Sequence, residues 1–205
     1  MRIAILGPSG VGKTTLCKAL ALDSKNQLAY VSASSRDLLP QTSIKQIDHL
    51  DDSEFDLQLI SKRTQLFNNL MGHRGSFITD RSLLDSAAYY ILKYSSTKQS
   101  CDIDEIVSHC LKETMKTFDY VINIPYSVGG NSSWKFEDNG SRIVNTYYQE
   151  TVSLVQSNLA YRLSIEDSSY FNRIRNCDIN LTTESRIEFI KTIIYPHEVT
   201  RAGLL

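Results

Sequence analysis

Residues 2–16 read Arg-Ile-Ala-Ile-Leu-Gly-Pro-Ser-Gly-Val-Gly-Lys-Thr-Thr-Leu. The stretch begins with a short apolar run, passes through a glycine-rich turn and ends in residues that favour the first turn of a helix. Gly7 and Gly12 are separated by four residues, and Lys13 and Thr14 follow directly. This spacing fits the phosphate-binding pattern Gly-x-x-x-x-Gly-Lys-[Ser/Thr].

The residue types in this turn suit the binding of an anion. Glycine allows backbone conformations that a Cβ would forbid, so successive N–H groups can point at a phosphate, and the following helix adds its positive end. We expect the Lys13 ammonium to reach the β- and γ-phosphates of ATP and the Thr14 hydroxyl to hold Mg²⁺. The residues expected to bind the nucleotide are Gly7, Pro8, Ser9, Gly10, Val11, Gly12, Lys13, Thr14 and Thr15.

The flanking residues support this interpretation over that of an ordinary glycine-rich turn between a strand and a helix. Residues 3–6 are apolar and predict a buried strand, and Leu16, Ala19 and Leu20 give the next helix an apolar face. An ordinary turn would explain the glycines but neither Lys13 nor Thr14.

Composition sets broad limits on the protein class. The chain has 205 residues, of which 41% are hydrophobic and 22% charged, and a formal net charge of −1. These values are typical of a globular domain and give no general attraction to DNA or acidic membranes. The four cysteines lack a Cys-x-x-Cys spacing, and the chain enters its first strand directly. We therefore expect reduced thiols, no signal peptide, no membrane association and a cytoplasmic location.

The periodicity along the chain predicts an α/β fold with a five-stranded, mostly parallel sheet and helices on both faces. Strands are expected at 3–6, 27–32, 75–80, 119–124 and 161–165, whereas 171–181 is ambiguous. Helices are expected from residue 13 and at 54–71, 82–94, 101–118, 142–159 and 182–194, and a helix or a turn is expected at 34–39. We expect one domain over 1–195 and a C-terminal tail over 196–205.

The longest stretch without periodicity runs from 126 to 142, and we call it the lid. A loop of this size in a compact domain is usually functional or disordered. Its cations, Lys135 and Arg142, and its Trp134 suggest a segment that closes over the transferring phosphate, with Arg142 as an arginine finger. The alternative is a surface loop with solvated charges and a tryptophan that only packs.

Asp80 and Arg81 directly follow the third expected strand, and Arg36 follows the second. An acid at the carboxyl end of a buried strand can serve Mg²⁺ or accept a proton, and an arginine there can bind the acceptor. The alternatives are that Asp80 caps the next helix and that both arginines are solvated.

These residues resemble the P-loop kinase superfamily of nucleoside and nucleotide kinases. The run Asp80-Arg-x-x-Leu-Asp85 is similar to the motif of thymidylate-kinase-like proteins and of the NadR-type nicotinamide riboside kinase group, both AAA-type P-loop kinases. The run 137–142 resembles the lid of the second group. The resemblance implies a P-loop kinase fold in which Lys13 and Arg142 stabilise phosphate and Asp80 is the base or a metal ligand. It also implies that Arg81 contacts the acceptor.

One position departs from the resemblance. The NadR-type group tends to carry Glu-x-x-Arg after the second strand; here Arg36 fits, but Ala33 stands at the glutamate position. A hydroxyl acceptor benefits from a base, whereas a monophosphate is already ionised, so the substitution favours a nucleotide acceptor.

We predict an ATP- and Mg²⁺-dependent phosphotransferase with a nucleoside- or nucleotide-type acceptor. One alternative is a phage-type kinase that phosphorylates a hydroxymethylated base, such as 5-hydroxymethyluracil, within DNA. The other is a P-loop NTPase switch or binding module that has no acceptor.

Overall fold

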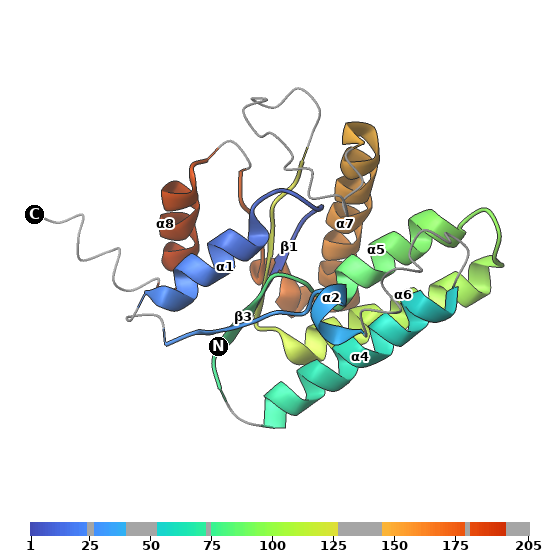
Figure 1. The fold of residues 1–205 in the computed structure, drawn as a ribbon, viewed down its shortest axis with the longest axis horizontal. Helices are drawn as coiled ribbons and strands as arrows, with labels where there is room; N and C mark the ends of the chain where they lie inside the picture. Colours follow the sequence, from blue (N-terminus) through green and yellow to red (C-terminus); the bar gives the residue numbers. More distant parts are fainter. Residues whose placement is uncertain (24–26, 40–52, 73–74, 127–144, 179–180, 196–205) are drawn as a thin grey trace, which may run out of the picture.

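The computed structural model describes residues 1–23, 27–39, 53–72, 75–126, 145–178 and 181–195 (Figure 1). Five strands form one sheet in the order β2-β3-β1-β4-β5, and every neighbouring pair is parallel. The strands are β1 (Arg2–Leu6), β2 (Ala29–Val31), β3 (Phe77–Thr79), β4 (Tyr120–Asn123) and β5 (Ile174–Asn176). Because all five run in one direction, their carboxyl ends lie along a single edge of the sheet.

Helices cover both faces of this sheet, as expected. They are α1 (Lys13–Leu22), α2 (Ser35–Leu38), α4 (Ser53–Gly72), α5 (Leu83–Tyr94), α6 (Ser100–Thr117), α7 (Thr146–Glu166), the 3₁₀ helix η1 (Ser168–Asn172) and α8 (Thr183–Ile194). In Figure 1, α1 and α8 lie on one side of the strands, and α4, α5, α6 and α7 lie on the other.

Alternation along β1 explains the two layers. Ile3 and Ile5 pack in one core cluster with residues of α1 and α8, whereas Ala4 and Leu6 pack in the other with residues of α4 to α7. All four side chains are fully buried. A strand buried on both faces needs an uninterrupted apolar run, which is what the sequence provides.

The prediction of a fifth strand at 161–165 is wrong. These residues form the end of α7, and the fifth strand is β5, within the segment that the sequence left ambiguous. Tyr161, Leu163 and Ile165 alternate as in a strand, yet Leu163 is fully buried while Tyr161 and Ile165 are exposed. Leu159, Ala160 and Leu163 continue the helical stripe of α7, so packing at spacings of three and four residues overrides the local alternation.

Parts of two predictions lie outside the described residues. They are the lid beyond Tyr126, with the expected helix start at residue 142, and the tail 196–205. Asn145 is the N-cap of α7 and accepts a hydrogen bond from the Tyr148 N–H, so the described helix begins at Thr146. Among the described helices, none has both the length and the apolar character needed to cross a membrane.

Candidate functional site

The loop between β1 and α1 has the backbone that its glycines predict. Gly7, Gly10 and Gly12 have φ angles of 149°, 92° and 83°, a region that side chains disfavour. A Cβ at Gly7 would lie 2.8 Å from the carbonyl oxygen of Ile124, which follows β4. Glycine is therefore required at position 7 both by its φ angle and by the close approach of a neighbouring strand end.

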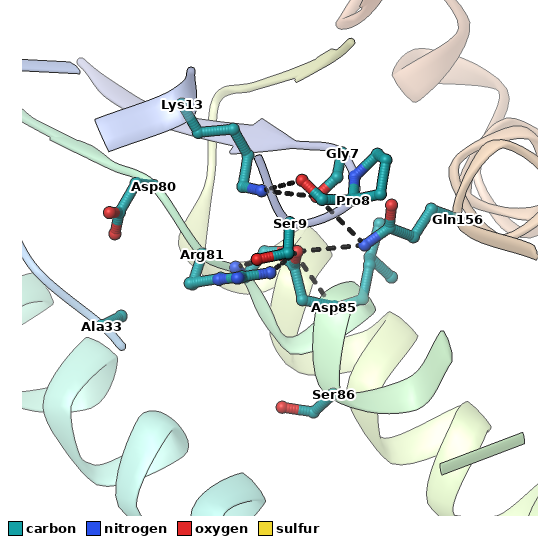
Figure 2. Close-up of polar contacts among 12 residues, drawn as sticks. Gly7, Pro8, Ser9, Lys13, Ala33, Asp80, Arg81, Asp85, Ser86 and Gln156 are labelled. Atoms are coloured by element: carbon teal, nitrogen blue, oxygen red, sulfur yellow. Dashed lines mark hydrogen bonds and ion pairs between the residues drawn. The ribbon is translucent and has the colours of Figure 1, made fainter. Parts of the chain in front are cut away.

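Lys13 lies inside this loop rather than on the surface. Its Nζ donates hydrogen bonds to the carbonyl oxygens of Gly7 and Pro8, both at 2.6 Å, and the residue is 5% exposed (Figure 2). Burial, followed by the nearby Arg81 cation, lowers the pKa of Lys13 from 10.5 to about 7. A cation held without a carboxylate partner in its hydrogen-bonding shell is poised to gain from an anionic ligand.

Thr14 and Asp80 meet at the carboxyl ends of β1 and β3. The Thr14 hydroxyl donates to Asp80 Oδ2 at 2.5 Å, and the Tyr30 hydroxyl donates to the same oxygen at 3.1 Å. Asp80 is 4% exposed, and its second oxygen, Oδ1, has no hydrogen-bond partner among the described residues. A hydroxyl beside a carboxylate with an unsatisfied oxygen is a donor set that suits Mg²⁺.

Asp80 does not cap the helix that follows it. The N-cap of α5 is Ser82, whose Oγ accepts from the Leu84 N–H, while the Asp85 carboxylate accepts from the Ser82 N–H at 2.7 Å. This capping box satisfies the start of α5 without Asp80. The capping alternative for Asp80 is therefore excluded, and its carboxylate is left for the interactions at the loop.

Arg81 is held by a buried carboxylate. Its Nη1 donates to Asp85 Oδ1 at 3.1 Å, and the Asp85 side chain is fully buried. The same oxygen accepts from Gln156 Nε2 at 3.1 Å, and that amide nitrogen also lies 3.4 Å from the Gly7 carbonyl oxygen. Figure 2 shows the resulting chain of contacts, which runs from Lys13 through Gly7, Gln156 and Asp85 to Arg81.

Helix α7 supplies polar side chains that sequence reasoning missed. Gln149, Ser153 and Gln156 are at most 2% exposed and lie along one helical stripe. Gln149 Oε1 accepts from the Ser9 N–H at 3.1 Å, and Ser153 Oγ accepts from the Tyr126 N–H at 2.7 Å. In the sequence of α7, these three polar residues recur at spacings of four and three positions among apolar residues. That spacing is the signal that could have predicted a buried polar face.

Sequence reasoning also missed Arg63, which lies in the middle of α4. Its side chain is 4% exposed; its Nε donates to the Ala33 carbonyl oxygen at 2.9 Å, and its Nη1 donates to the Ser86 hydroxyl. Burial lowers the pKa of Arg63 to about 10. Arg63 lies four positions after the buried Leu59 and four positions before the buried Phe67, so a cation interrupts the apolar stripe of α4.

The remaining predicted residues divide into two groups. Arg36 is exposed on α2, close to the elements that carry Ala33 and Arg63. Trp134, Lys135 and Arg142 lie outside the described residues. The structure thus brings together Lys13, Thr14 and Asp80 and links Arg81 to them through Asp85 and Gln156 (Figure 2), whereas Ala33 and Ser86 contact Arg63.

Comparisons with known proteins agree with this geometry. Residues 2–125 match the model of a family described as an AAA domain. No curated protein matches the chain in sequence with statistical significance. Several solved structures share its fold, among them three kinase-type proteins. Deoxyadenosine kinase from M. mycoides, with the products dCMP and dCDP bound, has a TM-score of 0.70 and 17% identity, and the match covers 96% of this chain and all of that one.

The other two structures are a thymidylate kinase from Candida albicans and the NadR protein in complex with NR. Each has a TM-score of 0.65 and 15% identity and matches 96% of this chain. The match covers 92% of the thymidylate kinase but 51% of the NadR protein. The α/β fold predicted from the sequence, that of the P-loop nucleoside and nucleotide kinases, is therefore confirmed.

Proposed function

We propose that this chain, which belongs to the AAA-domain family, is an ATP- and Mg²⁺-dependent kinase that transfers the γ-phosphate to a nucleoside- or nucleotide-type acceptor. The observation that carries the proposal is the meeting of Lys13 with the Thr14–Asp80 pair where β1 and β3 end. Phosphoryl transfer needs cations and a metal site at one place, with the acceptor beside them.

In this mechanism the loop 7–15 surrounds the phosphates, and the Lys13 ammonium exchanges its contacts with Gly7 and Pro8 for phosphate oxygens. Thr14 and Asp80 would hold Mg²⁺, which neutralises charge on the phosphates when it is bound. Asp80 also faces the side from which the acceptor would approach, and Arg81 would contact the acceptor. Catalysis is then positioning and charge stabilisation on elements that are already rigid.

The roles of the other predicted residues stay predictions. They are Arg142 as an arginine finger, Trp134 and Lys135 as contacts of the lid 126–142, and Arg36 as an acceptor contact. The single kinase domain over 1–195 is a prediction of the same kind, and so is the cytoplasmic location.

The decisive experiment measures transfer from γ-labelled ATP to a panel of acceptors, with Mg²⁺ and with excess EDTA. The panel contains nucleosides, nucleoside monophosphates and duplex DNA with 5-hydroxymethyluracil. We expect Mg²⁺-dependent labelling of a free nucleoside or nucleotide. ATP hydrolysis that no acceptor changes would instead identify an NTPase switch. Labelling of DNA alone, with a steep salt dependence, would identify the DNA kinase.

A further inference from the structure

The buried arginine Arg63 lacks an anionic partner on the acceptor side of the proposed site. In the described part of the chain, its hydrogen bonds go to the Ala33 carbonyl oxygen and the Ser86 hydroxyl. Both acceptors are neutral, and no carboxylate forms an ion pair with Arg63 there. A buried ionised group is costly unless it is paired, so this cation is under-compensated.

The guanidinium also has unused donors. It carries five N–H groups, of which the two hydrogen bonds use one on Nε and one on Nη1. The other three have no partner among the described residues. Because burial lowers the pKa of Arg63 only to about 10, the group is charged at neutral pH. A fork of donors in this state matches the geometry of a phosphate or carboxylate.

Among the described residues, the two neighbouring carboxylates accept hydrogen bonds from groups other than Arg63. Asp85 accepts from Arg81, Ser82 and Gln156, and Asp80 accepts from Thr14 and Tyr30. The charged groups around the site comprise three cations, the buried Lys13 and Arg63 and the half-buried Arg81, and two buried carboxylates, Asp80 and Asp85. The local charge balance therefore favours the arrival of an anion.

Ala33 contributes no charge to the surroundings of Arg63. It is fully buried and offers only its carbonyl oxygen to Arg63. Here no carboxylate at position 33 deprotonates a hydroxyl acceptor or neutralises Arg63.

We infer that the acceptor is itself an anion, a nucleoside monophosphate whose phosphate oxygens accept hydrogen bonds from Arg63 and Arg81. The inference rests on the proposed function and names the substrate class of that site. A phosphate oxygen of the acceptor attacks the γ-phosphorus of ATP, the bond from that phosphorus to the β–γ bridging oxygen breaks, and the products are ADP and a nucleoside diphosphate. No proton has to be removed, because a phosphate monoester is mostly a dianion at pH 7.

The test compares initial rates with each nucleoside and its 5′-monophosphate in saturating ATP and Mg²⁺. We expect kcat/KM for the best monophosphate to exceed that for its nucleoside by about a hundredfold, the effect of a charge-assisted pair of hydrogen bonds. Equal or faster transfer to nucleosides would overturn the inference and leave the proposed function intact, whereas transfer to hydroxymethylated DNA alone would overturn both. No transfer to any acceptor would overturn both.

Variants of Arg63 test whether this residue causes the preference for a monophosphate acceptor. Arg63→Gln should lower kcat/KM for the monophosphate by about thirtyfold or more while the KM for ATP stays unchanged, and Arg63→Lys should recover part of the loss. Arg173→Gln is the matched control, because Arg173 is exposed and lies next to the amino end of β5, at the opposite edge of the sheet. If Arg63→Gln fails to fold, the wild-type preference and Arg63→Lys still decide. An unchanged monophosphate preference in both Arg63 variants would contradict the inference.

Discussion

The donor half and the acceptor half of the proposed site are built in different ways. The donor half comes from one run of residues, 7–15, and its shape depends on backbone conformations at Gly7, Gly10 and Gly12. The acceptor half draws on four separate elements, through Ala33 after β2, Arg63 in α4, Arg81 after β3 and Ser86 in α5. A contiguous, backbone-built site can be recognised from a motif, whereas a dispersed side-chain site needs the fold.

This difference also separates the binding of a triphosphate, which is common to many proteins, from the choice of one acceptor. Backbone N–H groups and a lysine bind any nucleoside triphosphate tail, since all such tails are alike. Side chains on separate elements can change one at a time, and we propose that the combination of Ala33, Arg63 and Ser86 determines which acceptor is suitable. The following experiments test whether the two halves divide these roles.

The largest effect is expected at Lys13. Lys13→Met should lower phosphoryl transfer by about a thousandfold, since the buried ammonium contacts the carbonyl oxygens of Gly7 and Pro8, where we expect the phosphates to bind. Steady-state assays measure the loss, and circular dichroism checks that the fold is intact. Lys112→Met, at an exposed position on α6, is the control and should keep full activity. Activity within tenfold of wild type in Lys13→Met would refute the assignment.

A smaller loss is expected at the boundary between the two halves. Asp80→Asn keeps the shape of the side chain but removes a charge beside Thr14, so we expect turnover to fall about a hundredfold and the Mg²⁺ requirement to rise. Titration with Mg²⁺ at fixed ATP measures both. Asp102→Asn, exposed on α6, should behave as wild type. A normal Mg²⁺ dependence in Asp80→Asn would remove Asp80 from the metal site.

The free energy of unfolding can test whether the donor half depends on its backbone conformation at Gly7. Gly7→Ala adds a Cβ at a φ of 149°, 2.8 Å from the Ile124 carbonyl oxygen, and should lower the free energy of unfolding by about 2–3 kcal/mol. Gly75→Ala, where no heavy atom lies within 4 Å, is the matched control and should change it by less than about 0.5 kcal/mol. Chemical denaturation measures both values. Equal losses would mean that position 7 is not specially constrained.

Gln156 connects the two halves and should give a more modest loss. Gln156→Leu removes the amide that donates to Asp85 and approaches the Gly7 carbonyl oxygen, so one buried carboxylate oxygen loses a donor. We expect the free energy of unfolding to fall by about 1–2 kcal/mol. A stabilising effect would show that apolar packing of α7 outweighs these hydrogen bonds.

The smallest effect concerns pH. Burial lowers the pKa of Lys13 to about 7, whereas the unfolded chain keeps a value near 10.5. Between these values the unfolded state binds more protons, so this residue makes the free energy of unfolding rise with pH. The stability advantage of Lys13→Met over wild type should therefore shrink by about 1–2 kcal/mol between pH 7 and 8.5. A constant difference would contradict a depressed pKa.

The sequence predicted the elements whose signals are local. The loop 7–15, the strands at 77–79 and 120–123, and the long helices α4 to α6 follow from glycine spacing and apolar periodicity. The strand at 161–165 was wrong because Tyr161 and Ile165 look like strand residues, although tertiary packing uses only the helical stripe between them. Short β5 carries two polar residues, Arg175 and Asn176, and has almost no apolar pattern to read.

The acceptor half was the least predictable part of the site. Asp80 and Arg81 were found because they directly follow a buried strand. Arg63 was not found, since nothing in α4 tells which residue lies opposite its guanidinium; the partners, Ala33 and Ser86, are 30 and 23 positions away in the chain. The buried amides of α7 were missed for the same reason.

The carbonyl oxygen of Gly7 is shared by the two halves, because it contacts both Lys13 Nζ and Gln156 Nε2. Phosphates that draw Lys13 away would leave this oxygen to Gln156 alone and alter the support of Asp85 and Arg81. We therefore expect the two substrates to bind with a heterotropic coupling energy. By thermodynamic reciprocity, the factor by which ATP changes the affinity for the acceptor equals the factor by which the acceptor changes the affinity for ATP.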